Sequence, residues 1–166
     1  DFYRERDVVM EERRRNYETQ PWGLLREKLF STAFTRHPYG IPTIGHMAEL
    51  KVMERSVVEG HFRRYYGACN CVTVVVGHVD PDQMIELAER YLGKVPRGEP
   101  IPEVEIDEPP QVAERRVHVS FDAEPHMMVA WRVPSAGHED GPALAMLSSV
   151  LTDGRSSRVY RRAVIE

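Results

Sequence analysis

Two glutamates near the start of the chain share one stripe of a predicted helix. The helix is predicted over residues 4–16, where Glu5, Val8, Val9 and Glu12 follow the spacing of one helical face. A carboxylate on a packed face needs a partner, because an unpaired buried charge is costly. An arginine, a backbone amide or a metal ion could be that partner, so the stripe could do metal chemistry. Solvated Glu–Arg pairs are the commoner explanation of such a string.

A neighbouring stripe of the same helix carries apolar and aromatic side chains. Tyr3, Met10 and Tyr17 repeat every seven residues, which predicts that the helix is packed on both flanks of the glutamate stripe. Both glutamates would then lie among packed side chains.

Composition excludes several classes of function. The net charge of −4 arises from 22 basic and 26 acidic residues, so no strong field of one sign favours nucleic acid as a partner. No apolar run reaches the roughly 20 residues of a membrane span. Cys69 and Cys71 lie two apart with no ligands to complete a zinc quartet, and are predicted to be small buried hydrophobes.

The elements that position these residues follow from periodicity and turn signals. Pro21 should break the first helix. Ser56 and Glu59 have capping-box spacing, Asp80 precedes a proline at the first helical position, and Ser156 or Ser157 could cap the last helix. Further helices are predicted over 24–34, from 56 to 66, from 81 to 92 with Gly93 at the end, and from 140 to 152, with one more after 157. Strands are predicted over 71–76, 117–121 and 126–133.

The stretch from Pro96 to Pro110 alternates prolines with acids and carries no periodic apolar face, which is typical of an extended linker. Mixed helices and strands on either side of this stretch predict an α+β fold. The chain begins without Met inside a predicted helix and ends inside another, so we expect it to be part of a longer polypeptide.

Several segments in fixed order resemble the pitrilysin/insulinase family of zinc metallopeptidases, in particular the shorter bacterial members related to the mitochondrial processing peptidase. The resemblance covers essentially the whole chain and rests on the order of individually weak motifs. These are Glu5–Glu12, His37–Gly40 with Gly45, Tyr65–Gly67 with Asn70, Val74–Asp80 and Gly154–Tyr160.

The resemblance implies a domain organisation. Residues 1–98 would be the C-terminal part of one α+β peptidase-like domain, residues 99–111 a Pro-rich linker, and residues 112–166 the N-terminal part of a second, similar domain of the inactive type.

The resemblance also implies a zinc site. In this family two histidines of an H-x-x-E-H motif and a later glutamate bind zinc. The later glutamate corresponds to Glu12, and a supporting catalytic glutamate to Glu5, which could orient a ligand or the substrate. None of the seven histidines begins an H-x-x-E-H, so we expect Zn2+ in the intact parent and none bound by this chain alone. No substrate-binding residue is assigned.

The function implied is that of part of a zinc endopeptidase, inactive without the histidine pair. The alternative is a non-catalytic scaffold or substrate-holding subunit that pairs with an active relative. The expected partners are a peptide or unfolded polypeptide substrate and a second family member, as a homo- or heterodimer. Both the bacterial cytoplasm and the periplasm are compatible with the sequence.

Overall fold

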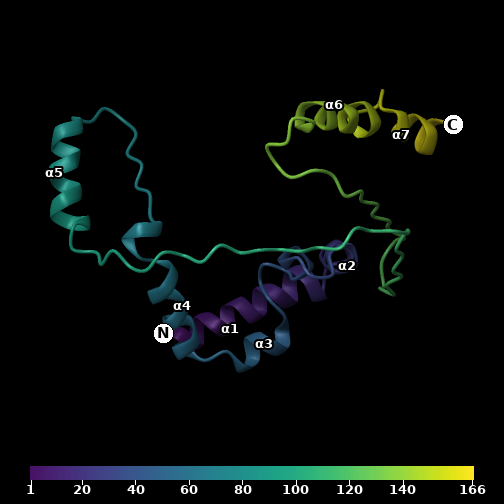
Figure 1. The fold of residues 1–166 in the computed structure, drawn as a ribbon. Helices are drawn as coiled ribbons and strands as arrows, with labels where there is room; N and C mark the ends of the chain where they lie inside the picture. The colour runs from purple at the N-terminus through teal and green to yellow at the C-terminus, as the bar shows by residue number, and fades with distance from the viewer. The chain divides into compact units, whose positions relative to one another are not determined.

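The computed structural model describes all 166 residues, from Asp1 to Glu166. They form two compact units, residues 1–128 and residues 129–166. Helices are the only regular elements in either unit, and Figure 1 labels them along the chain. No helix is both long enough and apolar enough to cross a bilayer.

The first unit holds five α-helices. They are α1 (Phe2–Arg13), α2 (Pro21–Ala33), α3 (Met47–Val52), α4 (Arg55–Tyr65) and α5 (Pro81–Leu92). A π-helical turn, Arg14–Glu18, extends α1, and two short 3₁₀ turns lie at Pro38–Gly40 and Ala68–Asn70. In the second unit are α6 (Gly141–Thr152), α7 (Arg158–Tyr160) and a π-helical turn, Arg161–Ile165.

Several predicted helix boundaries are confirmed. Pro21 ends the preceding helical stretch, as predicted, but it also opens α2, which therefore starts three residues before the predicted residue 24. A proline at the first helical position loses no hydrogen bond, because the N–H there has no partner inside the helix. Asp80 caps α5, because its carboxylate accepts hydrogen bonds from the N–H groups of Asp82 at 2.9 Å and Gln83 at 3.3 Å. Ser157 rather than Ser156 caps α7.

The predicted capping box at the start of α4 is wrong. The N-cap is Glu54, two residues before the predicted Ser56, and the helix begins at Arg55. The Glu59 carboxylate accepts instead from Arg55 Nε at 2.6 Å. This i, i+4 ion pair takes the acceptor that the capping box with Ser56 would have used.

The predicted α+β fold class is also wrong: helices account for 51% of the residues and strands for none. The three predicted strand segments have no ladder partner, and side chains such as Val72 (90% exposed) and Trp131 (80% exposed) face solvent. A β-branched run indicates a sequence that suits a pleated, half-buried surface. It forms a strand only where another segment pairs with its backbone, and no segment of this chain does so.

Two further expectations about packing are wrong. Both cysteines are exposed free thiols rather than buried hydrophobes. On α1 the glutamate stripe is exposed and Tyr3 is 52% exposed. The face of this helix that packs carries Arg6, Met10 and Arg13, followed by Tyr17 in the π-helical turn.

A segment without regular structure lies along α2, and we call residues 107–126 the strap. At the C-terminal end of α2, Arg115 donates hydrogen bonds to the carbonyls of Thr32 at 2.8 Å and Ala33 at 3.2 Å. At the N-terminal end of α2, the centre of the His126 ring lies 4.5 Å from the centre of the Trp22 ring. The strap therefore holds both ends of one helix. The domain boundaries proposed at residues 98 and 112 stay a prediction.

Candidate functional site

The Glu12 side chain lies on the exposed side of α1, in its last turn. It is exposed, and its carboxylate makes no ion pair or hydrogen bond. A carboxylate with no cationic partner has both oxygens free to bind a divalent metal. Glu12 meets this condition.

Glu12 lines a cavity of about 560 Å3 between α1, α2 and the loop that precedes α3. Its wall contains apolar groups, an amide and one basic side chain. The lining residues are Val9, Glu12, Asn16, Tyr17, Gly23, Arg26, Thr43 and Ile44. Gly23 keeps α2 close to α1, because a Cβ there would lie 1.8 Å from the carbonyl oxygen of Asn16.

A second cavity of about 500 Å3 adjoins the first. The two share Tyr17, Arg26 and Thr43. The remaining wall of the second cavity is mainly aromatic and apolar: Glu27, Phe30, Pro38, Tyr39, Ile41 and Pro42. The pair forms a continuous concave surface with Glu12 in one half and aromatic side chains in the other.

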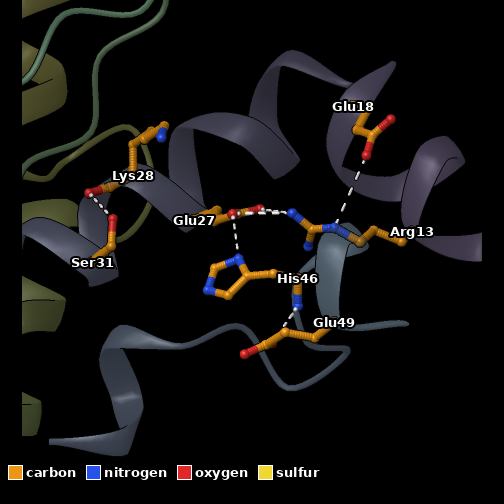
Figure 2. Close-up of polar contacts among 7 residues, drawn as sticks. All are labelled: Arg13, Glu18, Glu27, Lys28, Ser31, His46 and Glu49. Atoms are coloured by element: carbon orange, nitrogen blue, oxygen red, sulfur yellow. Dashed lines mark hydrogen bonds and ion pairs between the residues drawn. The ribbon is translucent and has the colours of Figure 1, made fainter. Parts of the chain in front are cut away.

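A buried ion pair positions α1 against α2. Arg13 is only 6% exposed, and one of its terminal nitrogens lies 2.9 Å and 3.1 Å from the two carboxylate oxygens of Glu27. Figure 2 shows Glu27 between Arg13 and His46, whose Nδ1 lies 3.6 Å from it. Because Arg13 is the neighbour of Glu12, this pair fixes the end of α1 that presents the carboxylate.

A second arginine joins the other half of α1 to α3. Arg6 donates hydrogen bonds to the carbonyls of Lys51 at 3.2 Å and Met53 at 3.4 Å. These carbonyls lie at the C-terminal end of α3, where helix carbonyls lack partners and the helix dipole favours a cation. The guanidinium also lies over the Tyr3 ring at 5.2 Å.

The turn after α2 is held by a carboxylate from the strap. Glu108 accepts hydrogen bonds from the N–H groups of Thr35, Arg36 and His37, the last two at 2.7 Å. Desolvation alone would raise the pKa of the Glu108 carboxyl. The hydrogen bonds from these three backbone groups and from the Thr35 hydroxyl outweigh it and lower this pKa from 4.5 to about 2.

Glu5 and Glu12 lie on one side of α1, as their spacing predicts. Both are exposed, and seven residues of helix separate them by a rise of about 10 Å. At this separation Glu5 is too far from Glu12 for the two carboxylates to bind the same ion. Glu5 is better placed to act on a neighbouring group. The roles assigned to Glu5 and Glu12 stay predictions.

The residues present do not form a zinc site by themselves. Structural and catalytic zinc sites use three or four ligands, and nowhere in the 166 residues do three His, Cys, Asp or Glu side chains gather closely enough to hold a metal. Glu12 fits zinc as one oxygen ligand of a larger set.

Two parts of the site were missed in the sequence. The stripe of Arg6, Met10, Arg13 and Tyr17 has helical spacing, but arginines read as surface residues unless their acidic partners are known. Arg26 sits among the apolar positions of α2, and only the placement of α1 and the loop 38–44 shows that it lines both cavities.

Comparisons with known proteins agree on one family. The sequence model described as "Peptidase M16 inactive domain" matches residues 53–166. The zinc protease PqqE of Helicobacter pylori is 32% identical over 161 residues, which are 95% of this chain and 36% of that protein. The beta subunit of the mitochondrial-processing peptidase of Neurospora crassa is 28% identical over 62% of this chain and 21% of its own length.

A solved structure supports the same assignment. The crystal structure of a protease from Helicobacter pylori has a TM-score of 0.84 and 30% identity, and the match covers 98% of this chain and 40% of that one. The chain therefore spans between a third and two fifths of these bacterial relatives. With a family model that covers more than half of its residues, the chain belongs to the M16 peptidase family, the pitrilysin-like zinc peptidases.

Proposed function

We propose that the chain is part of a zinc-dependent endopeptidase and supplies Glu12 as one of the ligands of its metal. The observation that carries the proposal is the unpaired Glu12 carboxylate in the wall of a cavity. The relative from Helicobacter pylori that is named zinc protease PqqE matches 95% of the chain. The other ligands, two histidines, would come from residues outside the 166.

The chemistry follows from this ligand set. When bound, zinc acidifies a water molecule so that it can attack a peptide carbonyl near neutral pH. The residues of this chain would bind and position the metal: Glu12 would be one of its ligands, and the Arg13–Glu27 pair fixes the helix turn that carries Glu12. Glu5, two turns earlier, would orient a ligand or the substrate.

The substrate class proposed is a peptide or an unfolded polypeptide. The two adjoining cavities, which share Tyr17, Arg26 and Thr43, could together accept neighbouring side chains of one extended peptide. We further propose that the full-length protein pairs with a second family member, as a homo- or heterodimer.

Substitution of Glu12 tests the metal-ligand role. The full-length protein with Glu12→Gln should lose most of its zinc, measured by plasma mass spectrometry, and its cleavage of fluorescein-labelled casein. Glu11→Gln is the matched control, because Glu11 is the adjacent exposed carboxylate and pairs with Arg14 at 3.0 Å. Equal zinc content and equal cleavage rates in the two variants would refute the assignment.

A non-catalytic scaffold or substrate-holding subunit is the second candidate. It is favoured by one observation: the matching family model, over residues 53–166, is described as an inactive domain. Glu5 and Glu12 precede the matched residues, so both functions are compatible with that match. A full-length wild-type protein that holds no zinc, and cleaves casein only after a relative is added, would favour the scaffold.

A further inference from the structure

We infer that Arg26 makes the cavity beside Glu12 a subsite for an acidic group of the substrate peptide. The inference rests on the proposed function and adds a substrate preference to it. Arg26 is the one residue of positive charge in the wall of either cavity, and it lines both. A peptide that runs from one cavity to the other must pass it.

The charge of Arg26 is not compensated within the protein. It makes no ion pair, and its guanidinium lies 5.7 Å from the centre of the Phe30 ring. The nearest acid in sequence, Glu27, is already engaged by Arg13 through two contacts of 2.9 Å and 3.1 Å. No salt bridge joins Arg26 to Glu12, although both line the same cavity.

Charge complementarity then selects the ligand. Zinc bound at Glu12 would neutralise that carboxylate, so Arg26 and the metal would leave the concave surface positively charged. A guanidinium binds a carboxylate through two parallel hydrogen bonds that fix its orientation. We therefore assign to the surface a peptide that carries Asp or Glu within a few residues of the bond to be cut.

The aromatic half of the surface defines the surroundings of this acidic group. Phe30 is 37% exposed and Tyr39 62% exposed, so both offer ring surface to a ligand. They would cover the aliphatic part of a Glu side chain while Arg26 binds its carboxylate. A lysine or arginine at the same place would meet the positive charge of Arg26 and be rejected.

The test uses pairs of dodecapeptides that differ only by Glu or Gln at one position, scanned along the peptide. Their dissociation constants for the full-length protein are measured by fluorescence anisotropy. Each measurement is made once on untreated protein and once on protein from which a chelator has removed zinc. We expect the wild type to bind the Glu peptide about tenfold more tightly at one or two positions. Arg26→Gln should bring this ratio close to one, and Arg26→Glu should invert it.

Lys28→Gln is the matched control. Lys28 is an exposed basic residue on the same helix, lines neither cavity and takes no part in the Arg13–Glu27 pair (Figure 2). This variant should keep the wild-type ratio. Circular dichroism identifies any variant that fails to fold. If Arg26→Gln does not fold, Arg26→Lys replaces it: this variant keeps the charge but not the planar guanidinium, and should retain part of the preference for the Glu peptide.

The outcomes separate the subsite from the proposed function. An unchanged Glu/Gln ratio in folded Arg26→Gln would overturn the subsite, whether or not the protein is a peptidase. A ratio that depends on Arg26 in a protein that holds no zinc and cuts no peptide would support the subsite and refute the peptidase. An equal fall in the ratio for Lys28→Gln would also overturn the subsite, because general charge would then explain it.

Discussion

Replacing Glu27 by Gln should destabilise the unit that holds α1 and α2 far more than its small change in size suggests. The side chains of Glu27 and Arg13 are 11% and 8% exposed. Two further nitrogens of Arg13, Nε and one terminal nitrogen, already lack hydrogen-bond partners. Without the Glu27 carboxylate the buried guanidinium would keep only the half-exposed Glu18 carboxylate, 4.0 Å from Arg13 Nε, as a counter-ion. Removing one partner of a buried pair costs about 3–5 kcal/mol, and we expect about 3 kcal/mol here because Gln keeps one acceptor oxygen.

Urea denaturation of the 166-residue chain, followed by Trp22 fluorescence after Trp131→Phe, measures this loss. Glu11→Gln is the control, since its exposed pair with Arg14 should contribute less than about 0.5 kcal/mol. The double variant Arg13→Met with Glu27→Leu should recover most of the stability, because two apolar side chains leave no buried charge unpaired and Glu18 is half exposed to solvent. A free energy of unfolding for Glu27→Gln within about 0.5 kcal/mol of the control would refute the reasoning.

Two predictions concern the strap. The Glu108 carboxylate should stabilise the protein fully above its unfolded pKa near 4.5 and lose this effect as the pH falls through about 2. The melting temperatures of wild type and Glu108→Gln should therefore differ at pH 7 and converge near pH 2; a constant difference would contradict the assignment. Arg115→Met removes the hydrogen bonds to the carbonyls of Thr32 and Ala33 and should cost about 1–2 kcal/mol in urea denaturation, whereas a loss below about 0.3 kcal/mol would contradict that role.

Helices were predictable from the sequence because their signals are local. Pro21 and Asp80 act on backbone groups within three residues, so their effect does not depend on the rest of the chain. The strands were not predictable in the same way. A run such as Val72–Val76 has strand composition, but a strand also needs a second segment to accept its backbone hydrogen bonds, and this requirement lies outside the run itself.

The candidate site was predictable only in part. The spacing of Glu5 and Glu12 correctly placed the two glutamates on one side of a helix, and the family resemblance singled them out. That face was expected to be packed and is exposed instead, because the packed face carries Arg13. An arginine becomes a core residue only through a partner such as Glu27, 14 residues away, and helical periodicity within one segment contains no information about that partner.

Polar contacts, more than apolar burial, therefore determine where the Glu12 carboxylate lies. Leu50, which is 5% exposed, is the only buried apolar residue of the chain, and α1 is joined to its neighbours through Arg6 and Arg13. Directional contacts of this kind fix the rotation of a helix about its axis, which an apolar stripe with many equivalent packings does less well. A metal ligand must hold its oxygen to within about 0.5 Å. The arginines on the inner face of α1 thus provide the positional control that the proposed ligand Glu12, on its outer face, would need.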